Sequence, residues 1–86
     1  MSGLKCYYLF EETTTDGKIT SQKRLEYNEV RPYLMDVIGI GFDQVDFALA
    51  VTADNVGVPY VLHKATEEGR LIYCANLTLK VEYWRH

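Results

Sequence analysis

Hydrophobic and polar residues alternate along two stretches near the start of the chain, and this pattern predicts a β-hairpin. Leu4–Glu12 and Ile19–Tyr27 both repeat with the period of two that is typical of a half-buried strand. Between them lies Asp16-Gly17, a dipeptide that strongly favours a tight hairpin turn. We therefore predict two antiparallel strands joined by a two-residue turn.

The turn also predicts the register of this hairpin. If Asp16-Gly17 forms the turn, Thr15 opposes Lys18, Phe10 opposes Lys23 and Tyr8 opposes Leu25, because cross-strand partners lie at equal distances from a hairpin turn. Side chains alternate between the two faces of a strand. One face is then mainly apolar, with Cys6, Tyr8, Phe10, Ile19, Leu25 and Tyr27, and the other, with Tyr7, Leu9, Glu11, Thr13, Thr20, Gln22, Arg24 and Glu26, is largely polar.

Asn28–Gly39 has the pattern of an amphipathic helix. Asn28 is a favoured N-cap residue, and Pro32 is tolerated only in a first turn, so the helix starts between these two positions. Gly39 is the expected end of the helix. The apolar residues recur at a spacing of three to four, at Val30, Leu34, Val37 and Ile38.

Residues Asp43–Thr52 fit two structures. The alternation of Val45, Phe47, Leu49 and Val51 with smaller or polar residues favours a strand. The alanines in the same stretch favour a second helix, which stays open as the alternative. We predict a strand here because the alternation is regular.

The rest of the chain predicts a second hairpin. Val58–His63 and Leu71–Ala75 flank Thr66-Glu67-Glu68-Gly69, an order that suits a type I turn followed by a left-handed glycine. Leu71–Trp84 is either one long strand or two. The expected fold is an α+β domain of order β-β-α-β-β-β, with about five antiparallel strands and one helix packed on one face of the sheet.

Composition restricts the class of protein. The 86 residues suffice for a single domain, residues 1–86, and 48% of them are apolar, as in ordinary globular proteins. The formal net charge is −3 and the basic residues are scattered, which disfavours nucleic-acid binding. The sequence shows neither a secretion signal nor a membrane-length apolar run, so we expect a cytoplasmic protein that does not associate with membranes.

Residues that could carry catalysis or bind a metal are few. Cys6, Cys74, His63 and His86 lack the close pairs that structural zinc sites normally show, so we expect neither a metal nor a cofactor. In the predicted second hairpin, His63 and Cys74 lie on opposite faces, which argues against a Cys–His catalytic pair. We expect two core thiols, two solvated imidazoles and no enzyme.

Aromatic residues indicate binding to protein. The chain has seven tyrosines, and Tyr83-Trp84-Arg85 joins three residue types that are enriched in interface hot spots. The terminal strand is also amphipathic and could be a sheet edge that pairs with another chain. For Trp84 itself, packing against the end of the core is the interpretation we favour, and a place in an interface is the alternative. The expected partner-binding residues are Tyr83, Trp84, Arg85, Tyr7 and Tyr60.

Three functional hypotheses follow. The first is a small cytoplasmic protein-binding protein that inhibits a partner by masking its surface, the way immunity proteins and phage-encoded antagonists act; this comparison depends on size, acidity and the lack of a catalytic set. The second is a homo-oligomeric structural or regulatory subunit. The third is a small enzyme or ligand-binding module that uses Cys74 and His63.

Overall fold

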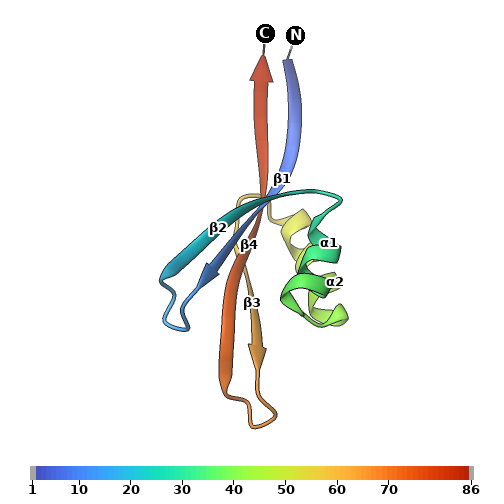
Figure 1. Cartoon of the computed structure of the whole chain (residues 1–86). Coiled ribbons are helices and arrows are strands. Elements are labelled where there is room, and N and C mark those ends of the chain that lie inside the picture. The colour runs from blue at the N-terminus through green and yellow to red at the C-terminus, as the bar shows by residue number, and fades with distance from the viewer. Residues whose placement is uncertain (1, 86) are drawn as a thin grey trace.

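The computed structural model describes residues 2–85 of the chain, which form one antiparallel sheet with a helical layer on one face (Figure 1). The elements are β1 (Ser2–Thr13), β2 (Ile19–Glu26), α1 (Val30–Pro32), the π-helical segment η1 (Tyr33–Ile38), α2 (Phe42–Asp54), β3 (Tyr60–Ala65) and β4 (Leu71–Arg85). The strand order across the sheet is β2-β1-β4-β3. The predicted α+β class with an antiparallel sheet is confirmed. None of the helices within residues 2–85 is long and apolar enough to span a membrane.

The first hairpin has the predicted register but a different turn. Tyr8 pairs with Leu25 and Phe10 with Lys23, as expected. The turn is longer than two residues, because the Thr14 N–H donates to the Lys18 carbonyl at 2.8 Å and the pairing of Thr15 with Lys18 is not formed. An irregularity between Glu12 and Thr13 restores the register. The Thr14 hydroxyl, which accepts from the Lys18 N–H at 3.0 Å, stabilises this longer loop.

The predicted helix at residues 28–39 is present, as α1 followed directly by η1. It begins after Glu29 instead of Asn28 and ends at Gly39, whose φ of 87° lies in the left-handed region that favours glycine. The wider π-helical turn changes which side chains face the sheet. Val30 and Leu34 are buried, whereas Val37, which the pattern placed on the same face, is exposed.

The strand predicted at Asp43–Thr52 is wrong, because this stretch is the helix α2. Val45, Ala48 and Thr52 are fully buried, a spacing of three and four residues, while Phe47 is 60% exposed. Val45 and Leu49 fit both a helical and an alternating pattern, so the alternation did not discriminate between a helix and a strand. The alanines favour the helix, and packing against the sheet decides for it. The sheet within residues 2–85 consequently has four strands instead of about five, and its helical layer contains a second helix.

The second hairpin forms in the predicted part of the chain, and β4 is one continuous strand. β3 pairs with the first half of β4, and Gly69 at the turn has a φ of 86°. Its loop repeats the geometry of the first hairpin: the Thr66 N–H donates to the Arg70 carbonyl, and the Thr66 hydroxyl accepts from the Arg70 N–H. Both loops lie at the same end of the sheet (Figure 1).

The core fills the space between the sheet and the helical layer. Tyr8 and Phe10 on β1 are almost fully buried, together with Leu77 on β4. The Tyr8 hydroxyl lies 3.2 Å from the Thr52 hydroxyl of α2, and the Thr52 hydroxyl also bonds to the Ala48 carbonyl at 2.8 Å. This buried pair fixes α2 against the middle of the sheet.

Beyond this core, β1 and β4 continue as a two-stranded arm that carries both ends of the chain (Figure 1). We define the arm as residues 2–6 of β1 and 81–85 of β4, which pair from Cys6–Val81 to Ser2–Arg85. β2 ends opposite Tyr7 and β3 begins opposite Leu77, so neither flanks the arm. The arm accounts for the elongated shape of the protein, 53 × 25 × 22 Å.

Candidate protein-binding surface

One face of the arm is apolar and uncovered. Tyr8 and Leu79 pair beneath the helical layer, so the next pairs on the same face are Cys6–Val81 and Leu4–Tyr83. Leu4 is 58% and Tyr83 82% exposed, because the helices end before they reach the arm (Figure 1). Exposed Tyr27, whose ring centroid lies 5.8 Å from that of Tyr8, adjoins the base of this face. We call this set the arm face: Leu4, Cys6, Tyr27, Val81 and Tyr83.

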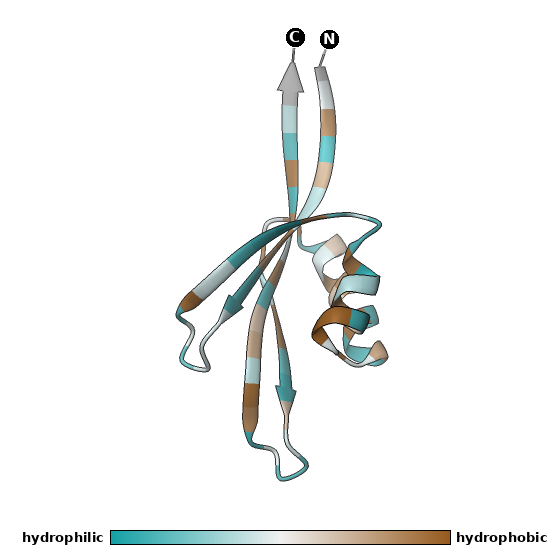
Figure 2. Ribbon diagram, viewed as in Figure 1, coloured by the Kyte–Doolittle hydropathy of each residue, from teal (hydrophilic) through white to brown (hydrophobic). Residues whose placement is uncertain are grey.

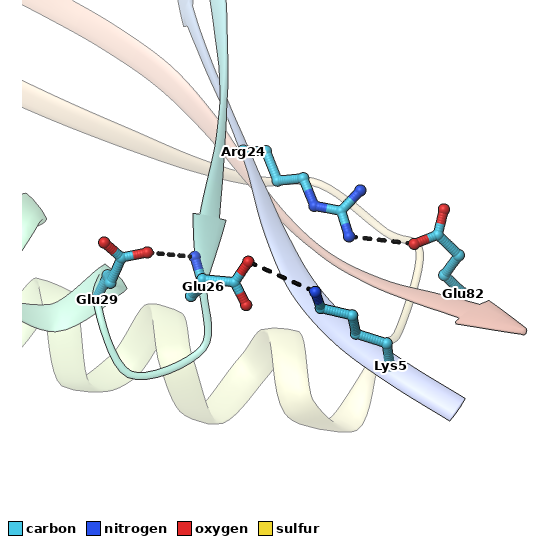
Figure 3. Close-up of polar contacts among 5 residues, drawn as sticks. All are labelled: Lys5, Arg24, Glu26, Glu29 and Glu82. Carbon is cyan, nitrogen blue, oxygen red and sulfur yellow. Dashed lines mark hydrogen bonds and ion pairs between the residues drawn. The ribbon is translucent and has the colours of Figure 1, made fainter. Parts of the chain in front are cut away.

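The opposite face at the base of the arm is polar and internally neutralised. The Arg24 guanidinium lies 3.1 Å from the Glu82 carboxylate, and the Lys5 ammonium lies 3.8 Å from the Glu26 carboxylate (Figure 3). Arg24 also covers the Tyr7 ring at 3.7 Å from its centroid. The side chains are about half exposed, so each ion pair contributes little stability. Polar and apolar bands thus alternate along both strands of the arm (Figure 2).

Three edge positions of the sheet are capped by neighbouring groups. The Gln44 side chain of α2 acts like an added strand on β3: its amide donates to the His63 carbonyl at 3.0 Å and accepts from the His63 N–H at 2.9 Å. On β2, the Glu26 N–H donates to the Glu29 carboxylate at 3.1 Å. On β4, the Leu79 carbonyl accepts from the Gly57 N–H at 2.9 Å. Such caps limit pairing with other chains.

The edges of the arm have no comparable cap within residues 2–85. In an antiparallel strand, alternate residues direct both backbone groups to the same side. The backbone carbonyl of Leu79 points toward the Gly57 loop, away from β1. The backbone N–H and C=O groups of Val81 and Tyr83 therefore point to this same side of β4, which is open in the arm. By the same rule, the backbone groups of Leu4 and Cys6 point away from β4, to the side of β1 that β2 no longer covers. The pairing of β2 with β1 ends at Tyr7. The arm therefore joins an apolar face to two free edges.

The predicted partner-binding residues are not gathered on one surface. Tyr83 lies on the arm face, but Tyr7 lies on the opposite face of the sheet under Arg24. Tyr60 is half-buried beside Phe47, with ring centroids 5.8 Å apart. Trp84 and Arg85 pair through their backbone with Gly3 and Ser2, whereas their side chains, like all of His86, lie outside the described part of the chain.

The register of the second hairpin corrects the expectation for the Cys–His pair. His63 lies directly opposite Cys74 on β4, so the two residues share a face. The prediction that they lie on opposite faces is wrong, because it assumed a register shifted by one residue. His63 is exposed and Cys74 is only 7% exposed. Cys6, predicted in the core, is exposed on the arm face. Within residues 2–85 no three His, Cys, Asp or Glu side chains could hold a metal ion together.

A groove of about 590 Å³ lies between α1 and α2. Its polar lining includes Asn28 and the ion pair of Arg31 with Asp46, at 2.5 Å. The two side chains are about half exposed, and their charges neutralise each other. The groove adjoins the base of the arm through Tyr27.

Two tyrosines with raised pKa values, Tyr8 and Tyr73, lie in packed, hydrogen-bonded parts of the fold. Burial raises the pKa of Tyr8, which lies against Thr52 in the core. Burial also raises the pKa of Tyr73, helped by the hydrogen bond that its hydroxyl donates to the Glu12 carboxylate at 2.7 Å. The other Glu12 oxygen accepts from Ser21 at 2.9 Å. These groups satisfy one another and connect neighbouring strands.

Comparison of the chain with protein-family models, with curated proteins and with solved structures gives no match. The site is therefore defined by its geometry. The sequence-based prediction included Tyr83 and the terminal strand, but it did not include Leu4 or Gln44. The pairing of the chain ends, which makes Leu4 the neighbour of Tyr83, left no local signal in the sequence. An isolated Gln44 likewise has the appearance of an ordinary polar residue.

Proposed function

We propose that the protein is a small protein-binding protein that acts by masking a surface of a partner, with the arm as its binding element. The observation that carries this proposal is the combination of an uncovered apolar face with two free strand edges in one projecting element. Exposed apolar surface beside unpaired backbone is typical of sites where a partner is bound.

The energy available at the arm is adequate for such binding. Complete burial of a large apolar side chain contributes roughly 1.5–3 kcal/mol. Leu4 and Tyr83 are mostly exposed, so covering both would contribute on the order of 3–5 kcal/mol. A few such anchors dominate the affinity of typical interfaces. The partner would be a protein of the cytoplasm, and the role an inhibitory one.

The test is a capture experiment with matched variants. Tagged wild-type protein, the double variant Leu4→Ser/Tyr83→Ser and the control Val61→Ser/Ile72→Ser are each used to isolate partners from cells that produce the protein. Val61 and Ile72 are 55% and 58% exposed and lie outside the arm face, so the control removes similar surface elsewhere. We expect the control to retain the partner and the arm variant to lose at least 30-fold in affinity, about 2 kcal/mol.

Retention of the partner by the arm variant would contradict the proposal. Light scattering on a sizing column, run with purified protein, separates this function from the homo-oligomeric alternative. The ligand-binding alternative has one observation in its favour, the placement of His63 opposite Cys74. Loss of function in Cys74→Ala, with folding unchanged, would favour it.

A further inference from the structure

The arm offers a partner two separate features, a set of side chains and a set of backbone groups. A partner could cover the arm face without using the backbone, or it could extend the sheet as a new strand. The backbone directions on β4 distinguish these modes, because Val81 and Tyr83 turn their N–H and C=O groups away from β1.

We infer that the β4 edge of the arm binds an extended segment of another protein by strand addition, and that this segment has an apolar–cationic–apolar pattern. This inference rests on the proposed function and specifies its mode of recognition and the chemistry of its partner. The new strand would run beside Val81, Glu82 and Tyr83, and it would end where the Gly57 loop covers Leu79.

The pattern follows from the strand that β4 already pairs with. On its inner edge, Tyr83 lies opposite Leu4, Glu82 opposite Lys5, and Val81 opposite Cys6. β1 therefore places one cation between two apolar residues, and its cation lies opposite the single acidic residue of the arm. A strand on the outer edge meets the same three side chains of β4. Arg24 binds one oxygen of the Glu82 carboxylate from the side of β1, and Lys5 itself binds Glu26. No hydrogen bond or ion pair among the described residues uses the other Glu82 oxygen. Opposite charges across a strand pair are favourable and like charges are not, so a cation on the outer edge fits beside this oxygen and an anion does not.

A second copy of the chain fits this edge less well. Suppose that the second copy added its β1 to the β4 edge of the first copy, in the register of the native pair. The β4 of the first copy would then collide with β2 of the second copy, because β2 lies beside β1 from Tyr7 onward. If two β4 edges met about a twofold axis with Val81 opposite Tyr83, Glu82 would lie opposite Glu82 of the other copy. An independent extended segment avoids both conflicts.

Proline provides a selective test of the backbone. The N–H of residue 83 faces the open edge, so Tyr83→Pro removes a donor that the fold itself does not use. Tyr83→Ala removes the side chain and keeps the donor. Glu82→Pro is the control for folding, because the Glu82 N–H faces β1 and its loss should weaken the arm.

The probe is a synthetic peptide of residues 2–8 of this chain, compared with the same peptide carrying Lys5→Glu. Amide hydrogen exchange of the full chain is followed by NMR with peptide added to millimolar concentration, and light scattering reports the mass. We expect protection of the Val81 and Tyr83 amides, at least tenfold weaker binding of the Lys5→Glu peptide, a moderate loss in Tyr83→Ala and no binding to Tyr83→Pro.

Other outcomes overturn the inference. They are unprotected Val81 and Tyr83 amides at millimolar peptide, equal binding of both peptides, full binding by folded Tyr83→Pro, or a dimer of the chain alone with these amides protected. The captured partner separates the two proposals. If Leu4→Ser/Tyr83→Ser loses the partner while Tyr83→Pro retains it, the arm face binds without strand addition. If both variants retain it, the proposed function itself is wrong.

Discussion

Replacement of Gln44 tests whether a helix side chain caps the edge of the sheet. In Gln44→Ala, the His63 N–H and carbonyl both lose their partner. Each such hydrogen bond contributes a net 0.5–1.5 kcal/mol or so. His63 is exposed, so water can replace the lost partner and the low end of that range applies. We expect the free energy of unfolding to fall by about 1 kcal/mol, the sum of two such bonds at the low end.

The control is Gln44→Glu, which keeps an acceptor for the His63 N–H but lacks the donor for the His63 carbonyl at neutral pH. We expect it to preserve part of the cap and to place a carboxylate near a carbonyl oxygen. Urea unfolding followed by circular dichroism measures the total effect. Amide exchange measures the local one: the His63 amide should exchange faster in Gln44→Ala, and the Leu62 amide, which faces β4, should not.

Two results would refute this reasoning. An unchanged exchange rate at His63 would mean that Gln44 does not protect the edge in solution. A loss of stability well above 3 kcal/mol would mean that Gln44 organises the packing of α2 and is more than a cap. Gln44→Ala should also increase self-association at high concentration if the cap prevents edge pairing, which sedimentation can detect.

Three further predictions concern the core and the helix end. Tyr8→Phe should lower the free energy of unfolding by about 0.5–1.5 kcal/mol, and Thr52→Val by about 1–3 kcal/mol, because Thr52→Val leaves the buried Tyr8 hydroxyl without its partner. In a double-mutant cycle measured by urea unfolding, the double variant should lose less stability than the sum of the two single variants. Additive losses would show that the two hydroxyls do not interact. The free energy of unfolding should fall as the pH rises above about 10, because the pKa of Tyr73 is raised in the folded protein and its phenol ionises more easily in the unfolded chain. In Tyr73→Phe this alkaline decline should be shallower. An identical decline would exclude the Tyr73 phenol as its source. Gly39→Ala should cost about 1 kcal/mol or more by thermal unfolding, because alanine is strained at a φ of 87°, whereas a neutral effect would mean that the helix end rearranges.

The sequence by itself determined the features that depend on neighbouring residues. The alternation of apolar residues and the Asp16-Gly17 turn were sufficient to predict the register of the first hairpin, even though the loop is longer than predicted. Gly39 and Gly69 correctly marked a helix end and a turn, because both need a backbone that other residues rarely adopt. The alternation along the terminal strand placed Tyr83 on the same face as Leu77 and Leu79, but it did not indicate that Tyr83 lies beyond the core and is exposed.

Tertiary structure decided what depends on residues far apart in the chain. Residues 42–54 satisfy a helical and an alternating pattern in part, and only the buried contacts of Val45, Ala48 and Thr52 with the sheet select the helix. The candidate binding surface depends on the same kind of information. Leu4 and Tyr83 become neighbours because β1 pairs along its whole length with residues 74–85 of β4, which are far from it in the sequence. Local pattern reports which residues prefer to be buried, but the partner that buries them, or leaves them exposed, is set by long-range packing.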